Sequence, residues 1–137
     1  MPRPISGRCS MIATFSRLFD FGSSTQKYVF LTPKSADGKL GLALTTSGNG
    51  AETRIPTNFT MTAGQWTDIK VTFKANTNGT TTGTIFANGV QVGQNTAMPL
   101  APKDLGRTSG NFLGKSQFPD PYLAGSFDSF EIDGVVR

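Results

Sequence analysis

The sequence predicts an all-β protein built as an antiparallel sandwich, and three observations support this fold class. Short segments in which apolar and polar residues alternate recur along the chain, and an alternation of period two is typical of strands. Clusters of Gly, Pro, Asn and Asp separate these segments, as turns between strands do. Only 16% of the 137 residues are charged, Thr and Phe are abundant, and no segment shows a helical period.

The predicted strands follow one another at regular spacing. The first, 13–21, alternates so that Phe15, Arg17 and Phe19 share one side. The dipeptide Asn88-Gly89 between two later segments is the strongest short hairpin signal in the chain. The complete series is 13–21, 27–32, 39–46, 51–55, 65–74, 80–87, 90–93, 111–114 and 126–133.

The composition limits the classes of function. The length suits one domain, and the single Cys9 excludes an internal disulfide. The chain has no His, which excludes Ser-His-Asp and Cys-His triads and the usual zinc sites. Its net charge of +4 is scattered rather than clustered, so we expect no nucleic-acid partner. No apolar run is long enough for a membrane span, and no signal peptide is visible.

Four segments, taken in order, carry a resemblance to a known family. They read RLFDFG (17–22), TAGQWTDIKVT (62–72), IFANGVQVG (85–93) and GNFLGKSQFPDPYLAGSFDSFEIDGV (110–135). Together they resemble laminin-G-like, concanavalin A-like lectin domains, in which the last segment forms a closing hairpin. The resemblance implies a jelly-roll sandwich that binds carbohydrate, often with structural calcium and often appended to a bacterial glycoside hydrolase. We therefore expect a secreted or extracellular parent protein.

The N-terminal end departs from that family pattern. Members of the group have several more strands before the RLFDFG segment, including one beside the last strand, whereas residues 1–12 read as an unrelated leader. We expect the sandwich domain to occupy 13–137 and to be incomplete. Because a missing outer strand exposes unpaired N–H and C=O groups, we expect the chain to pair with a second copy through its edge strands, or to fold only marginally alone.

Carboxylate pairs are the one catalytic option that the composition leaves. Glu131 and Asp133 resemble the start of the catalytic motif of jelly-roll glucanases, but that motif needs a further Glu three residues on, and none is present. A glycosidase needs a second carboxyl group at a defined separation, and none is evident. We expect the protein not to be an enzyme.

The loop 116–122 (SQFPDPY) is a candidate ligand-binding loop. Its prolines stiffen it, and a rigid loop loses less entropy on binding. Aromatic side chains stand there beside an amide and a carboxylate, the groups that stack on and hydrogen-bond to sugars. A stable turn whose aromatic residues cap the core explains the loop equally well. The candidate residues are Gln117, Phe118, Asp120 and Tyr122.

Two further sets of residues are candidates for sugar binding. Asn49, Glu52 and Arg54 stand beside a Gly-rich turn, where Arg can grip paired hydroxyls or a carboxylated sugar. A surface ion pair is the alternative there. Arg17 and Asp20 can line a concave sheet face, although a cross-strand salt bridge explains them as well.

Asp128 is the candidate metal ligand, because the resemblance implies an acidic side chain near a calcium ion at that position. Calcium takes six to eight oxygen ligands, and several of them would come from the strands that this chain is expected to lack. Asp128 can then be an orphan ligand that bonds to the backbone instead. Trp66 is the one tryptophan, and we expect it to pack in the core rather than to serve as a sugar platform.

These observations together predict a non-catalytic carbohydrate-binding module, part of or derived from a larger glycan-degrading enzyme, whose partner is a polysaccharide or oligosaccharide. The alternatives are a structural or adhesive sandwich without a sugar ligand and a jelly-roll glycan hydrolase. Domains of one fold recognise unrelated glycans through loop changes, so the fold does not identify the sugar.

Overall fold

The protein is described here by a computed structural model, which covers residues 5–132. Its elements are strands and two short 3-10 turns. In chain order they are β1 (Ile5–Met11), β2 (Phe19–Gly22), β3 (Tyr28–Thr32), β4 (Gly41–Thr45), η1 (Asn49–Ala51), β5 (Thr53–Pro56), β6 (Thr67–Ala75), β7 (Thr81–Ala87), β8 (Val90–Met98), η2 (Pro102–Leu105), β9 (Gly110–Leu113) and β10 (Ala124–Ser129). No helix in the described part of the chain is long and apolar enough to cross a membrane.

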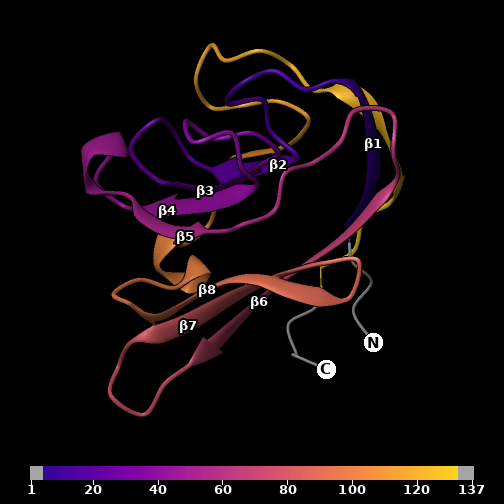
Figure 1. Cartoon of the computed structure of the whole chain (residues 1–137). Coiled ribbons are helices and arrows are strands. Elements are labelled where there is room, and N and C mark those ends of the chain that lie inside the picture. Colours follow the sequence, from indigo (N-terminus) through magenta and orange to yellow (C-terminus); the bar gives the residue numbers. More distant parts are fainter. Residues whose placement is uncertain (1–4, 133–137) are drawn as a thin grey trace.

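The strands form two antiparallel sheets that pack face to face (Figure 1). One sheet has the order β10-β1-β6-β7-β8, and the other has the order β5-β4-β3-β2-β9. We call the second one the β5–β9 sheet. This arrangement confirms the predicted all-β antiparallel sandwich.

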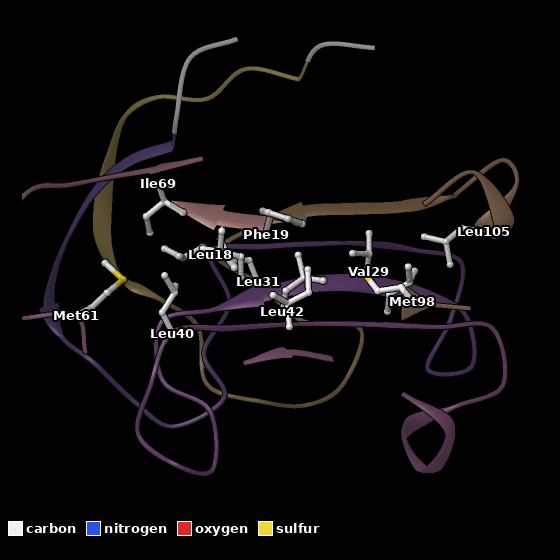
Figure 2. Close-up of a cluster of buried hydrophobic side chains, with 13 residues drawn as sticks. Leu18, Phe19, Val29, Leu31, Leu40, Leu42, Met61, Ile69, Met98 and Leu105 are labelled. Atoms are coloured by element: carbon white, nitrogen blue, oxygen red, sulfur yellow. The ribbon is translucent and has the colours of Figure 1, made fainter. Parts of the chain in front are cut away.

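The core lies between the two sheets and is built by strand alternation (Figure 2). In the β5–β9 sheet, Leu31 stands opposite Phe19 on one side and Leu42 on the other, and Leu42 in turn stands opposite Ile55. These inward side chains are buried. Burying a side chain of this size contributes about 1.5–3 kcal/mol. The opposite sheet contributes Ile69, Ile85 and Met98 to the same cluster.

The predicted Asn88-Gly89 hairpin is confirmed. Both residues have positive φ, 51° for Asn88 and 81° for Gly89, and they connect β7 to β8 with Ala87 opposite Val90. Two such residues match the right-handed twist of paired strands. Asn88 also bonds to the neighbouring strand β6, because its backbone N–H donates to the carbonyl of Asp68 at 2.7 Å.

The N-terminal segment differs from the expected leader. Residues 5–11 form β1, which lies between β10 and β6, with Ser6 opposite both Ser129 and Asp68 (Figure 1). The segment is rich in small and polar residues and does not alternate, so two neighbouring strands rather than its own pattern make it extended. The last strand therefore has a neighbour where the sequence suggested a gap. Residues 1–4 of the predicted leader lie outside the described residues.

The two segments predicted to form a closing hairpin lie in different sheets, so that prediction was wrong. β9 is antiparallel to β2, with Phe112 opposite Asp20, whereas β10 is antiparallel to β1. The connection 114–123 crosses from one sheet to the other. Alternation identified both strands, but it carries no information about which strand is the partner.

The two sheets also meet at one side, where β5 lies against β8. A Cβ atom added at Gly93 would lie 2.2 Å from the carbonyl oxygen of Pro56, so only glycine permits this approach. The backbone N–H of Asn58 donates to the carbonyl of Val92 at 3.1 Å, and Asn95 Nδ2 donates to the carbonyl of Arg54 at 2.9 Å. These contacts hold the backbone of β5 in place.

Candidate functional site

The outer face of the β5–β9 sheet, away from the core, carries most of the polar candidates. Across the strands, Asp20 stands opposite Phe30, Phe30 opposite Ala43, and Ala43 opposite Arg54. This row alternates with the inward row of the core, so its side chains leave the sheet on the other side. It therefore places a carboxylate, an aromatic ring, a methyl group and a guanidinium side by side.

A hollow of about 210 Å³ lies on this face over β3, β4 and β5. It forms because β4, which lies between β5 and β3, presents only small residues there, Gly41, Ala43 and Thr45, while its leucines face the core. Around the hollow stand Phe15, the turn that carries Ser35 and Asp37, and the side chains of Glu52 and Arg54.

Phe15 forms one wall of the hollow and has an unusual backbone conformation. Its φ is 62°, in the left-handed region that bulky residues rarely adopt. Two hydrogen bonds hold it there: its N–H donates to the carbonyl of Lys34 at 2.8 Å, and its own carbonyl accepts from Arg17 Nη1. Its side chain keeps 37% of its surface exposed.

The turn at Phe15 also overturns the predicted strand 13–21. Only its last part is a strand, beginning at Phe19, so the alternation that placed Phe15 with Arg17 and Phe19 does not hold. The left-handed residue reverses the chain direction and ends the periodicity. Local alternation could not reveal this, because the hydrogen bonds that stabilise the turn come from Lys34 and from a buried guanidinium.

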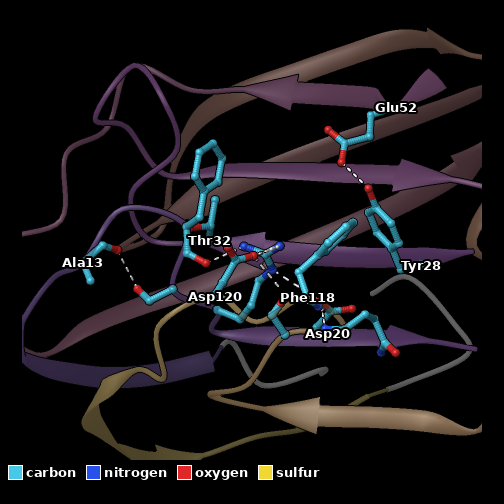
Figure 3. Close-up of polar contacts among 12 residues, drawn as sticks. Ala13, Asp20, Tyr28, Thr32, Glu52, Phe118 and Asp120 are labelled. Atoms are coloured by element: carbon cyan, nitrogen blue, oxygen red, sulfur yellow. Dashed lines mark hydrogen bonds and ion pairs between the residues drawn. The ribbon is translucent and has the colours of Figure 1, made fainter. Parts of the chain in front are cut away.

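Arg54 and Glu52 stand together at the other side of the hollow, as the ion pair that the sequence allowed. Arg54 Nε and Nη2 both donate to Glu52 Oε1, at 3.1 and 2.8 Å. Glu52 Oε2 accepts from the hydroxyl of Tyr28, and burial, followed by this hydrogen bond, raises the pKa of that hydroxyl (Figure 3). Glu52 is therefore held in place, whereas the Arg54 side chain is 66% exposed and can donate to a ligand.

Asp37 places an exposed carboxylate on the rim of the hollow. Its Oδ1 accepts from Ser35 Oγ at 2.5 Å and from the backbone N–H of Lys39 at 3.0 Å. These two hydrogen bonds, with Ser35 the larger, lower the pKa of Asp37 below its ordinary value. The carboxylate is thus a fixed, ionised acceptor.

The other half of the outer face is covered by the loop 114–123, whose Phe118 and Asp120 lie near Asp20 (Figure 3). Arg17 joins the loop to the sheet, because its Nη2 donates to Asp120 Oδ2. Arg17 is 2% exposed; its Nη2 lies 3.0 Å from Asp120 Oδ2 and its Nε lies 3.3 Å from Asp20 Oδ2. Its guanidinium carbon is 3.7 Å from the centre of the Phe30 ring. Arg17 and Asp20 do form an ion pair, but it is buried and does not line the hollow.

Asp20 is fully buried beneath the loop. Its Oδ2 accepts from the backbone N–H of Gln117 at 3.1 Å, while its Oδ1 has no hydrogen-bond partner. Burial raises the pKa of this carboxyl group, and the hydrogen bond from Gln117 and the charge of Arg17 only partly oppose the effect.

The loop residues proposed from the sequence mostly contact the protein itself. Gln117 Nε2 donates to the carbonyl of Gly110 at 2.7 Å. Phe118 packs edge-on against Tyr28, with ring centres 5.5 Å apart, which agrees with the core-capping alternative. Tyr122 differs, because it is 71% exposed.

The remaining candidates lie away from the hollow. Asn49 is exposed in η1, and Asp128 is exposed on β10, in the opposite sheet. Within residues 5–132 no group of three or more Cys, Asp or Glu side chains is placed to hold a metal ion. Calcium ligation by Asp128 stays a prediction. Trp66 is 49% exposed, and its expected place in the core was wrong, because it precedes β6 rather than lying within an inward row.

Most of the residues that line the hollow were not predicted from the sequence, among them Phe15, Asp37 and Ala43. One signal was available. In the segment 39–46 (KLGLALTT), Gly, Ala and Thr alternate with Leu, so one face of this strand has almost no side-chain volume. Such a strip of small residues between larger neighbours predicts a depression. No comparable pattern in the sequence predicts that Phe15 lies at the hollow.

Comparisons with known proteins identify a family and solved structures of similar fold. The model of the Concanavalin A-like lectin/glucanases superfamily matches residues 9–136. No curated protein matches the chain in a sequence comparison. Among solved structures, domain 4 of AbnA, a GH43 extracellular arabinanase from Geobacillus stearothermophilus in complex with arabinotriose, is similar with a TM-score of 0.65 and 18% identity. The match covers 90% of this chain and 56% of that one.

Two other solved chains are similar. The CBM40 of the Ruminococcus gnavus IT-sialidase, bound to α2,3-sialyllactose, has a TM-score of 0.64 and 15% identity over 93% of this chain and 72% of that one. Residues 221–444 of an S-layer domain-containing protein from Clostridium thermocellum ATCC 27405 are 35% identical, with a TM-score of 0.46, over 86% of this chain and 56% of that one. At identities below 25%, the first two structures indicate a shared fold.

Proposed function

From the premise that the chain belongs to the Concanavalin A-like lectin/glucanases superfamily, we propose that it is a non-catalytic carbohydrate-binding domain of a secreted glycan-degrading enzyme. The observation that carries the proposal is the hollow on the outer face of the β5–β9 sheet, with one exposed aromatic wall and charged side chains on its rim.

The chemistry of the hollow suits a sugar. A sugar ring has a C–H face that packs on an aromatic side chain and hydroxyl groups that both donate and accept hydrogen bonds. Phe15 supplies the first contact, Arg54 supplies donors and Asp37 supplies an acceptor. Binding sites of this kind are concave and largely apolar, with a few placed polar groups.

Two further observations support the proposal. Arabinotriose and sialyllactose are bound in the two solved structures of like fold. The one largely buried carboxylate of the hollow, Glu52, accepts from Tyr28 and from Arg54 through different oxygens, which positions it as a structural acceptor rather than a proton donor. Of the suggested glucanase pair, Glu131 is exposed and Asp133 lies outside the described residues.

Retention on polysaccharides tests the proposal. Wild-type protein is applied to affinity gels and glycan arrays of plant, microbial and host glycans, with calcium or with a chelator. We expect at least one glycan to retain it, and Arg54→Ala to weaken that binding tenfold or more. Arg107→Ala removes an exposed Arg outside the hollow and is the matched control. Absence of retention on every glycan would contradict the proposal and favour a structural sandwich.

A further inference from the structure

We propose that the hollow receives one uncharged sugar unit at the end of a glycan chain, with its ring against Phe15 and its hydroxyls between Arg54 and Asp37. The inference rests on the proposed function and goes beyond it, because it specifies how much of a glycan is bound and of which charge. Four features support it: the volume of the hollow, the side chains that close it, the charges around it and the strained backbone of Phe15.

The size of the hollow suits a single ring. Its volume of about 210 Å³ is below the roughly 300–1,000 Å³ of sites that enclose larger, drug-sized ligands. Several consecutive sugar units would need a longer groove across the strands, and the loop 114–123 lies over the neighbouring part of this face.

Neighbouring side chains close the hollow on two sides. Toward β2, the guanidinium of Arg17 lies on the Phe30 ring, and the loop held by Asp120 covers the face beyond it. Toward one end of the strands, Phe15 and the turn around Asp37 form a wall. The edge strand β5 bounds the remaining side, where Arg54 and Pro56 are exposed. A glycan can therefore insert its terminal unit and leave past β5, but cannot continue across the sheet.

The charges around the hollow favour an uncharged unit. Glu52 and Asp37 are two carboxylates, and Arg54 is the one cation that lines the hollow. The charge of Arg54 is already compensated, because two of its N–H groups donate to Glu52. A carboxylated sugar would approach these two carboxylates in a partly enclosed site, whereas neutral hydroxyls can donate to the carboxylates and accept from Arg54.

Phe15 is the residue whose conformation points to a ligand. A bulky side chain in the left-handed region is strained, and such strain persists only where the surroundings impose it. Here Lys34 and Arg17 impose it through the two backbone hydrogen bonds of Phe15. The result is a ring that is presented to the hollow and held before binding, which lowers the entropy lost on association.

The test uses the whole chain and the glycan that it retains. Phe15→Gly removes the ring and keeps a backbone that tolerates positive φ, and thermal unfolding verifies the fold. We expect affinity to fall tenfold or more in calorimetry, while Trp66→Ala, which removes an exposed ring beside the opposite sheet, leaves it within twofold. The free monosaccharide that ends the glycan should compete, and the same glycan ended by a uronic or sialic acid should bind at least tenfold more weakly.

The outcomes separate this inference from the proposed function. If glycans bind but Phe15→Gly matches wild type, or acid-ended glycans bind best, or the terminal monosaccharide fails to compete, the inference is overturned and the function stands. A loss confined to Tyr122→Ala would move the site to the 114–123 loop and would also overturn it. If no glycan binds at all, the proposed function itself fails.

Discussion

The two halves of one sheet face differ sharply in how they use similar residues. Over β2 and β3, Arg17 and Asp20 are buried and contact other protein groups. Over β4 and β5, Arg54 is 66% exposed beside a hollow. Both halves carry a charged side chain on a strand, Asp20 on β2 and Arg54 on β5, but only the first lies beneath the loop 114–123.

The difference shows that the surroundings, not the residue types, separate stability from binding. A buried guanidinium with two carboxylate partners stabilises the loop, because its removal would leave a carboxylate buried without a compensating charge. An exposed guanidinium contributes little to folding, since water screens its ion pair. The exposed one is thus available to a ligand at small cost in stability.

The largest effect on stability is expected for Arg17→Met, which removes the cation that pairs with Asp20 and Asp120 beneath the loop 114–123. Asp20 would remain buried and lose its cation, so the free energy of unfolding should fall by about 3–5 kcal/mol. Urea denaturation followed by tryptophan fluorescence measures it. Arg54→Met should lower stability by about 1 kcal/mol or less. Equal losses of stability in the two variants would contradict the conclusion that the covered half stabilises the fold and the open half does not.

A smaller loss is expected for Phe118→Ala. This partly buried ring packs edge-on against Tyr28, so its removal should cost about 2 kcal/mol, less than for a fully enclosed Phe. The hollow lies over the other half, and we therefore expect glycan affinity to change less than twofold. Calorimetric titration beside urea denaturation checks both numbers; a large loss of affinity with intact stability would mean that the loop itself binds the ligand.

The smallest effect concerns pH and has opposite signs in the two halves. The pKa of Asp20 is raised in the folded protein, so between the ordinary value of 3.8 and this raised pKa the folded state holds a proton that the unfolded state has lost. This group therefore favours folding increasingly as pH falls. Asp20→Asn removes the contribution, and the stability of wild type relative to this variant should rise from pH 7.5 to pH 4.5.

Asp37→Asn is the matched comparison on the open half. The pKa of Asp37 is lowered, so its contribution is present above the ordinary value of 3.8 and is lost as pH falls through its folded pKa. Wild type should therefore lose stability relative to Asp37→Asn on acidification, the reverse of Asp20→Asn. Urea denaturation measures both differences, for Asp20→Asn from pH 7.5 to pH 4.5 and for Asp37→Asn at pH values that extend below 3.8, where the lowered pKa lies. A change of the same sign in both comparisons would contradict the assignment.

Much of the fold could be predicted because strand formation leaves a local trace. The alternation around Leu42 and Leu44 identified β4, and Asn88-Gly89 identified a hairpin. The segment 13–18 failed because the left-handed Phe15 interrupts the alternation. β1 was missed because its extended conformation depends on neighbours that come from 67–69 and 124–129.

The candidate site was predicted in part. Arg54 and Glu52 were named from the sequence and do stand at the hollow. Arg17, Asp20 and Asp120 were also named, and the structure brings them together in a cluster in which Arg17 and Asp20 are buried and Asp120 is partly exposed. Exposure separated the two outcomes, and exposure depends on what a distant loop covers.

The sequence alone determined most of the strands and the two faces of those that alternate, because backbone alternation and turn chemistry act between residues close in the chain. The family resemblance likewise rests on segments read directly from the chain. The tertiary structure decided which strands are neighbours, placing β1 beside β10 and separating β9 from it. It also decided that the loop 114–123 covers one half of a sheet face and leaves the other half hollow. Those choices depend on contacts between residues as far apart as Arg17 and Asp120, which no local pattern encodes.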